Sequence, residues 1–190
     1  MLSRTRASQR PDGSMLPMKD VPGIEALAAH GARVVSSTTP QTFLDNMFCV
    51  SGEIPRVTPF ERGLAWHYRK TADGQDWEAD PWLMDERSLA VNVAGKGLVV
   101  FTACSHAGVI NVLTHARESF PDAPFHAVLG GLHLAGPNEA IIAETVEAMR
   151  AFDLRVIAAG HCTGWRAVTA LANEFGGIVD PSAVGKRYSF

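Results

Sequence analysis

The chain has 190 residues, of which 46% are hydrophobic and 19% charged, a composition typical of a globular protein long enough to bury a core. Its formal net charge is −3 and its Lys and Arg residues are scattered, so we expect neither nucleic acid nor a membrane as a partner. No stretch reaches the roughly 18 apolar residues of a membrane span, and the N-terminus lacks the apolar core of a signal peptide. Three cysteines, an odd number without the spacing of a disulfide scaffold, indicate a reducing compartment, and we predict a cytoplasmic protein.

The N-terminal half carries weak secondary-structure signals. Residues 1–20 are polar and show neither a helical nor a strand period, which predicts a poorly ordered lead-in, with one domain over residues 21–190. A short helix is expected from Ile24 to the stop at Gly31, followed by a strand over residues 32–36 and another around residues 48–50. The Trp- and acid-rich segment over residues 72–86 is expected to be a loop.

The signals are stronger after residue 87. Two apolar, β-branched runs, SLAVNV and GLVVFTAC, flank Ala94-Gly95-Lys96 and predict a hairpin. Helices and strands then alternate, and they are expected over residues 108–119, 125–129, 138–152, 155–159 and 165–175. This alternation predicts an α/β fold.

Candidate metal ligands follow three successive predicted strands. Cys104 and His106 follow the first strand, His133 the second, and His161 the third. Thiolate and neutral imidazole at rigid strand ends suit Zn or Fe, and α/β proteins place their chemistry at such ends. The alternatives are an inert structural Cys and His residues that only bond to loop carbonyls. His133 could be a ligand, a proton carrier or a substrate-binding group.

The turn SGEIPR contains two candidate substrate-binding residues, Glu53 and Arg56. A guanidinium can bind a phosphate or carboxylate with two hydrogen bonds. The alternative is an ordinary loop salt bridge between the two side chains.

Taken in order, SGEIPR, Asp85-Glu86, KGLVVFTACSHAGVINVL, AVLGGLHL and GHCTG resemble a branch of the metallo-β-lactamase superfamily over roughly residues 40–190. That branch includes metal-dependent hydrolases and proteins similar to 7,8-dihydropterin-6-methyl-4-(β-D-ribofuranosyl)-aminobenzene-5′-phosphate synthase. The resemblance implies an α/β fold, the C-terminal portion of an αβ/βα sandwich, with a metal centre in its cleft.

The resemblance also implies roles for individual residues. Cys104 takes the position of the bridging ligand, His106 lies beside it, and His161 matches the late His, so all three are expected to bind metal. His133 is expected to assist protonation. Arg56 and Glu53 are expected to bind the substrate.

One departure from the family pattern is large, because the ligand string H-x-H-x-D-H does not occur in this chain. A divalent metal ion, Zn with Fe or Mn as alternatives, is therefore expected to bind weakly or not at all. The chain also begins inside what would be the first domain of the sandwich. We expect it to form a homodimer or to pair with a complementing N-terminal half, because a half-sandwich exposes apolar faces and strand edges.

The expected function is that of a metal-dependent hydrolase acting on a small molecule, in which a metal-bound hydroxide attacks an ester or phosphate-type bond, with activity impaired in this truncated chain. One alternative is a catalytically inactive fragment that serves as a structural or dimerising unit. Another is a pterin-linked transferase or synthase.

Overall fold

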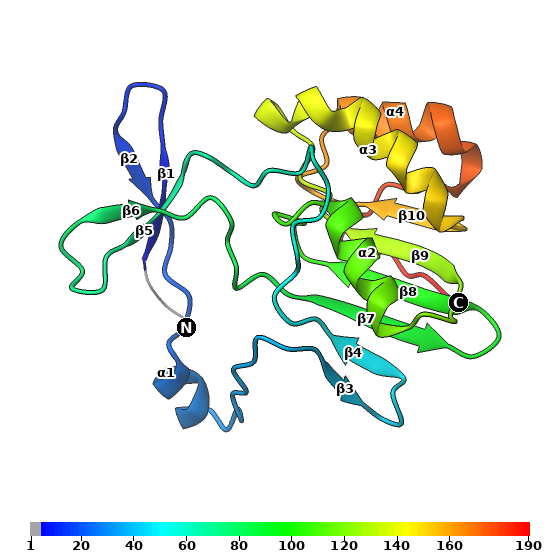
Figure 1. The fold of residues 1–190 in the computed structure, drawn as a ribbon, viewed down its shortest axis with the longest axis horizontal. Coiled ribbons are helices and arrows are strands. Elements are labelled where there is room, and N and C mark those ends of the chain that lie inside the picture. The colour runs from blue at the N-terminus through cyan, green and yellow to red at the C-terminus, as the bar shows by residue number, and fades with distance from the viewer. Residues whose placement is uncertain (1–4) are drawn as a thin grey trace. The chain divides into compact units, whose positions relative to one another are not determined.

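The computed structural model describes residues 5–190, and the chain divides into two compact units. The larger unit comprises residues 38–62 and 86–190, and the smaller unit comprises the residues up to 37 together with residues 63–85 (Figure 1). The sequence predicted a single domain after a short lead-in. The division differs because a segment from the middle of the chain pairs with the N-terminal residues.

The larger unit is built on a six-stranded sheet with the order β10-β9-β8-β7-β4-β3. The strands are β3 (Gln41–Phe43), β4 (Phe48–Val50), β7 (Ser88–Val93), β8 (Gly97–Thr102), β9 (Phe125–Gly130) and β10 (Val156–Ala159). β7 and β8 form the predicted antiparallel hairpin, whereas β8, β9 and β10 are parallel. The carboxyl ends of these three strands therefore lie along one edge of the sheet.

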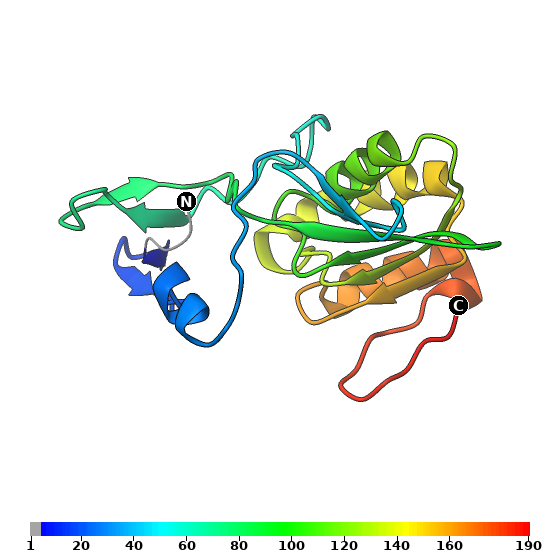
Figure 2. The same ribbon diagram turned by 90° about the horizontal axis from the view of Figure 1, so that it is seen from below.

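Three helices share one apolar core with one face of this sheet. They are α2 (Val109–Ser119), α3 (Ile142–Met149) and α4 (Trp165–Phe175), and α2 and α3 lie on the same side of the sheet (Figure 2). Leu113 from α2, Met149 from α3 and Leu171 from α4 are all buried in that core. Val100 and Ile157 contribute to it from the sheet.

The predicted elements of this unit are confirmed, with one adjustment. The helix expected over residues 138–152 is α-helical only in its middle, because the 3-10 turns η1 (Gly136–Ile141) and η2 (Arg150–Phe152) flank α3. Pro137 stands at the first turn of η1, where a missing backbone N–H costs nothing. Asp153, in the left-handed conformation with φ of 45°, ends the helical segment before β10.

The smaller unit has a four-stranded antiparallel sheet with the order β2-β1-β5-β6. It comprises β1 (Arg6–Gln9), β2 (Met15–Pro17), β5 (His67–Lys70) and β6 (Trp77–Ala79), and the helix α1 (Ile24–Ala29) belongs to the same unit. The prediction that residues 1–20 lack strands is wrong for the described residues. The segment predicted as a loop over residues 72–86 contains the short strand β6, and its other residues lie in turns, bends and irregular backbone. The strand expected over residues 32–36 does not form.

These strands lack an apolar alternation because cross-strand polar pairs hold them. Arg69 lies opposite Glu78 with 2.8 Å between Nε and Oε1, and the ammonium group of Lys70 lies 4.5 Å from the ring centroid of Trp77. Such pairs stabilise neighbouring strands without a hydrophobic face. Short charged strands of this kind give no period-2 signal in the sequence.

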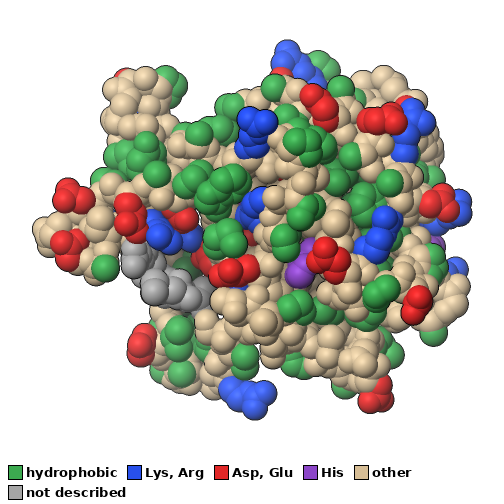
Figure 3. Space-filling model, viewed as in Figure 1, with side chains coloured by type: hydrophobic (Ala, Val, Ile, Leu, Met, Phe, Trp, Pro, Cys, Tyr) green, Lys and Arg blue, Asp and Glu red, His purple; other side chains and the backbone are tan. Residues whose placement is uncertain are grey.

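Among residues 5–190, no helix is both long and apolar enough to cross a bilayer. On the face drawn in Figure 3, acidic and basic side chains are interspersed, with apolar side chains between them.

Candidate metal centre

Three loops that follow parallel strands form the candidate site. Cys104 follows β8, His133 follows β9, and Cys162 follows β10, so strand order alone brings these residues to one edge of the sheet. The loops are tied together by backbone contacts, since the Gly160 amide donates to the Gly130 carbonyl at 2.7 Å and the Ala135 amide donates to the Cys162 carbonyl at 3.2 Å.

The side chains of Cys104, His133 and Cys162 converge. The Cys104 sulfur lies 3.0 Å from the Cys162 sulfur and 3.2 Å from His133 Nδ1. All three ligand atoms lie within 4.8 Å of one another, and each of the three residues is half-buried. The structure thus brings together one predicted ligand, Cys104, with His133, which was predicted to be catalytic, and Cys162, for which no role was predicted.

The backbone at the cluster is held in uncommon conformations. His133 has φ of 49° and Ser105 has φ of 53°, both in the left-handed region that non-glycine residues rarely occupy. The side-chain Nδ2 of Asn138 donates to the His133 carbonyl at 2.8 Å, and the hydroxyl groups of Thr102 and Ser105 lie 2.9 Å apart. Strain of this kind persists only where the surroundings enforce it, and it concentrates at functional sites.

The two sulfurs of the cluster lie within hydrogen-bond distance of each other, and this contact shifts their pKa values in opposite directions. The hydrogen bond with Cys104 lowers the pKa of Cys162, burial opposes this shift, and a further hydrogen bond from His133 supports it. The same hydrogen bond, together with burial, raises the pKa of Cys104. One sulfur therefore becomes a thiolate readily while the other stays protonated and donates to it.

A buried carboxylate, Glu86, holds the loop between Cys104 and α2. Its Oε1 accepts a hydrogen bond from the His106 amide at 2.7 Å, and its Oε2 accepts one from the Ala107 amide at 2.6 Å. The same Oε1 lies 3.1 Å from His106 Nδ1. Although burial opposes it, these hydrogen bonds hold the pKa of Glu86 below its ordinary value. A carboxylate at Nδ1 favours the tautomer of His106 with the proton on Nδ1 and a lone pair on Nε2.

A second buried carboxylate, Glu61, caps the first turn of α2. It accepts hydrogen bonds at 2.8 Å from the amides of Ile110 and Asn111, which have no partner within the helix. Gly108 makes this approach possible, because a Cβ there would lie 2.0 Å from the Glu61 carboxyl carbon. Burial raises the pKa of Glu61 to about 7, against the lowering effect of these hydrogen bonds.

His106 and His161, both predicted metal ligands, lie outside the three-residue cluster. The His106 ring packs edge-on against the His133 ring, with 4.8 Å between centroids, so His106 borders the cluster. The His161 side chain is exposed, and its neighbour Cys162 faces the cluster instead. Cys104 and Cys162 each follow a predicted strand, and thiolates are strong zinc ligands. This recurrence of cysteine at strand ends is the sequence signal that could have identified Cys162.

The predicted substrate-binding residues separate in the structure. Arg56 is half-buried, its Nη1 donates to the Ile54 carbonyl, and burial lowers its pKa while the charges of Glu86 and Glu61 oppose that shift. A guanidinium attracted to two buried carboxylates balances their charge. The Glu53 side chain is exposed.

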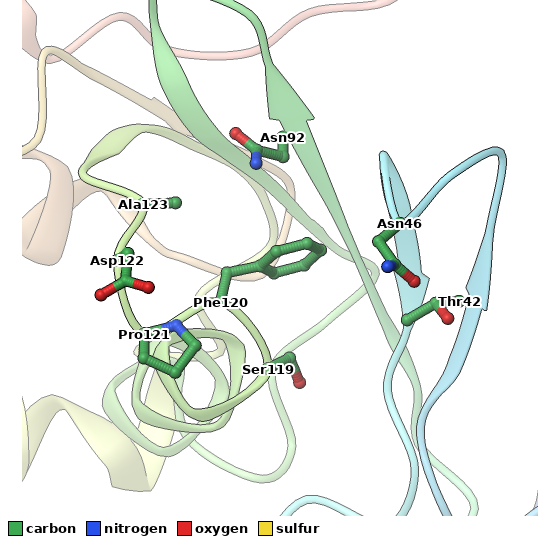
Figure 4. A pocket seen from close by; sticks show the side chains of 8 residues that line it. All are labelled: Thr42, Asn46, Asn92, Ser119, Phe120, Pro121, Asp122 and Ala123. Carbon is green, nitrogen blue, oxygen red and sulfur yellow. The ribbon is translucent and has the colours of Figure 1, made fainter.

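A cavity of about 440 Å³ in the larger unit is separate from the cluster. Its lining includes Asn46, Asn92 and the loop of residues 119–123, which precedes the amino end of β9 (Figure 4). Because Cys104 and His133 follow the carboxyl ends of β8 and β9, this cavity lies at the opposite edge of the sheet.

The donor set of the cluster fits a metal ion. Two thiolates and one imidazole are a ligand set used by catalytic zinc sites, which keep a fourth position open. In such a site the ligand atoms lie about 3.5 to 3.8 Å apart, as follows from Zn–S and Zn–N bonds of roughly 2.3 and 2.1 Å. The separations of 3.0 and 3.2 Å require the sulfurs to move apart by less than about 1 Å.

Comparison with known proteins identifies the fold. No protein-family model matches the chain. A crystal structure of a metal-dependent hydrolase of the beta-lactamase superfamily superposes with a TM-score of 0.71 and 25% sequence identity, covering 83% of this chain and 58% of that one. The chain therefore has the metallo-β-lactamase fold.

The chain is also similar in sequence to a protein of the branch that the motifs predicted. It is 31% identical over 106 residues to the 7,8-dihydropterin-6-methyl-4-(β-D-ribofuranosyl)-aminobenzene-5′-phosphate synthase of Methanocaldococcus jannaschii. The match covers 56% of this chain and 36% of the synthase, so the chain spans little more than a third of that relative. The predicted fold class and the predicted branch are both confirmed.

Proposed function

We propose that this metallo-β-lactamase relative uses Cys104, His133 and Cys162 to hold one divalent metal ion, with zinc as the expected metal, and acts as a hydrolase of esters or phosphate esters. The observation that carries the proposal is the convergence of two sulfurs and one imidazole within 4.8 Å at the ends of three parallel strands. A metal ion bound there would lower the pKa of a water molecule to about 7 and polarise a carbonyl or phosphoryl oxygen.

The side chains around the cluster support this chemistry. Glu86 lies 3.1 Å from Nδ1 of His106, and the His106 ring packs against the His133 ring, so His106 stands beside the cluster with a carboxylate that orients its imidazole for proton transfer. We assign the protonation role to His106, because His133 is needed as a ligand. The half-burial of the cluster leaves it open to a small-molecule substrate while strengthening its electrostatic interactions.

Metal content measures the first part of the proposal. We expect the purified chain, loaded with zinc and then desalted, to retain about one equivalent, and Cys104→Ser, His133→Ala and Cys162→Ser to lose it. His161→Ala is the matched control, because His161 is exposed and lies outside the cluster. Loss of zinc from His161→Ala but not from His133→Ala would move the site to the ligands expected from the family pattern. A wild-type chain that retains no metal would instead support the reading of a structural or dimerising unit.

Hydrolysis measures the second part. We expect the zinc-loaded chain to cleave p-nitrophenyl acetate or bis-p-nitrophenyl phosphate, and chelation with EDTA to abolish the activity. His106→Ala is expected to lower kcat about 100-fold or more with zinc content unchanged, as loss of a general acid–base group does. Zinc-loaded protein that cleaves neither compound would contradict the hydrolase while leaving the metal site intact.

A second candidate function is favoured by the identity to the synthase over 106 residues. If the chain shares that activity, its site should bind a reduced pterin. Titration of the zinc-loaded chain with 7,8-dihydropterin, followed by pterin fluorescence, measures this directly. Saturable binding that disappears in Cys162→Ser supports the synthase, and fluorescence that does not change excludes pterin binding.

A further inference from the structure

We infer that Cys104 and Cys162 are a site of reversible oxidation that forms an intramolecular disulfide bond. The two sulfurs lie 3.0 Å apart although the residues are separated by 58 positions in the chain. Both side chains are half-buried, so a small oxidant reaches them. Two thiols held in contact by separate loops are arranged for a covalent bond that needs only a small further approach.

The surroundings hold the two sulfurs together. The loops that carry them are joined through the β9 loop, because the Gly131 amide donates to the Ala103 carbonyl at 3.3 Å and the Leu132 amide donates to Thr163 Oγ1 at 3.1 Å. Gly131 also provides the room for this contact, since a Cβ at that position would lie 2.4 Å from the Cys162 sulfur. The sulfur contact is therefore set by the parallel strands and the glycine between them.

The oxidant in this reaction is a low-molecular-weight disulfide. The thiolate of one cysteine attacks a sulfur of the oxidant, which breaks the oxidant's S–S bond, forms a mixed disulfide and releases one small thiol. The second cysteine then attacks the mixed disulfide at the protein sulfur, which forms the Cys104–Cys162 bond and releases a second small thiol. Two electrons and two protons pass from the protein to the oxidant, which leaves as two thiols.

Cys49 provides an internal comparison. It is 3% exposed within β4, and its sulfur lies 3.7 Å from the Val50 carbonyl oxygen. A buried thiol without a nearby sulfur is expected to resist the same oxidant. Oxidation should therefore consume two of the three thiols and leave Cys49 free.

The disulfide has a consequence for the metal centre, and this consequence rests on the proposed function. The same two sulfurs are the proposed metal ligands, so a chain with the disulfide keeps only His133 of the three donors. Metal binding and oxidation then exclude each other, and oxidation releases the metal while bound metal protects the thiols.

The experiment uses the full chain, reduced and freed of metal with EDTA, and then incubated with oxidised glutathione. We expect intact-protein mass spectrometry to show the loss of two hydrogen atoms without added glutathione, and a non-reducing digest to contain a peptide pair that joins Cys104 to Cys162. Cys49→Ala should give the same product, whereas Cys104→Ser and Cys162→Ser should stop at the glutathione adduct. Dithiothreitol should restore the starting mass. A wild-type product that is only a glutathione adduct, or a disulfide that includes Cys49, would overturn the inference.

A parallel sample loaded with zinc separates this inference from the proposed function. If zinc slows disulfide formation at least about 10-fold and the disulfide form fails to bind zinc, both hold. If the disulfide forms equally fast with and without zinc, the oxidation site stands and the proposed metal centre fails. If zinc binds but the metal-free chain forms no disulfide, the metal centre stands and the oxidation site fails.

Discussion

Replacement of Glu86 with Gln removes one charge and little volume from beneath the candidate metal centre. In the folded chain the Glu86 carboxylate receives three contacts, from the amides of His106 and Ala107 and from Nδ1 of His106. A Gln side chain has one oxygen. If that oxygen serves the two contacts from His106, its NH₂ group faces the Ala107 amide, and one donor loses its acceptor.

The cost follows from these contacts. Hydrogen bonds to a charged group contribute about 1.5–3 kcal/mol each, and the Glu86 side chain is only 7% exposed, so solvent screens them little. Loss of one such bond therefore predicts a decrease of about 2 kcal/mol in the free energy of unfolding at pH 7. The effect should depend on pH, because the folded state holds the pKa of Glu86 below its ordinary value of 4.5. The stability from Glu86 is present above pH 4.5 and is lost as pH falls through the depressed pKa.

Urea denaturation at pH 7, repeated at steps down to the lowest pH at which the protein stays folded, measures this difference. Glu53→Gln is the matched control, because Glu53 is exposed and its replacement should change the free energy of unfolding by less than about 0.5 kcal/mol. The Glu86→Gln deficit should shrink toward acidic pH. A deficit below about 0.5 kcal/mol at pH 7, or one that grows on acidification, would refute the role assigned to this carboxylate.

Three further changes test other parts of the larger unit. Gly131→Ala places a methyl group 2.4 Å from the Cys162 sulfur and should weaken zinc binding by at least about 10-fold in a chelator competition, whereas Gly177→Ala, where a Cβ meets nothing within 4 Å, should leave it unchanged. Burial raises the pKa of Glu61 from 4.5 to about 7, so the stability that Glu61 contributes is complete below pH 4.5 and is lost as pH rises through 7. The free energy of unfolding of wild type relative to Glu61→Gln should therefore fall by at most about 3 kcal/mol between pH 5 and pH 8. A rise over this range would contradict the assignment. Leu113→Ala empties a fully buried position in the core and should lower the free energy of unfolding by about 3 kcal/mol, which thermal and urea denaturation measure.

Much of the larger unit could be predicted because its strands are buried and its helices face one core. Runs such as GLVVFT have an apolar residue at nearly every position, and α2 carries Val109, Val112, Leu113 and Ala116 at helical spacing. The smaller unit escaped prediction because its strands are only three or four residues long and are paired through charges. Arg6 shows why such pairing is invisible in the sequence, since its carboxylate partners Asp80 and Asp85 lie more than seventy positions away.

The location of the candidate site in the fold could be predicted from the sequence, but only some of its residues could. Strand ends marked by Cys104, His133 and the GHCTG segment were expected to meet, because successive parallel strands end at one edge of the sheet. The carboxylates that support this edge gave no comparable signal. Glu61 lies in an unremarkable segment, and its role depends on Gly108, which is 47 positions away and allows the close approach.

The choice between His161 and Cys162 shows where sequence reasoning ends at such a site. The two residues lie in the turn after β10, and both side chains come close to Gly131, because a Cβ there would lie 2.4 Å from the Cys162 sulfur and 2.9 Å from His161 Cε1. Only the Cys162 sulfur joins Cys104 and His133 in the cluster. Chemistry alone does not decide between them, because imidazole and thiolate both bind zinc. The decision comes from the backbone after β10, where the hydrogen bond from the Ala135 amide to the Cys162 carbonyl fixes the direction of the peptide and the side-chain-free Gly131 gives the Cys162 sulfur its space. Cys162 therefore places a second sulfur beside Cys104, where the family pattern expects an imidazole. This one exchange makes possible both a metal centre with two thiolates and a disulfide that competes with the metal.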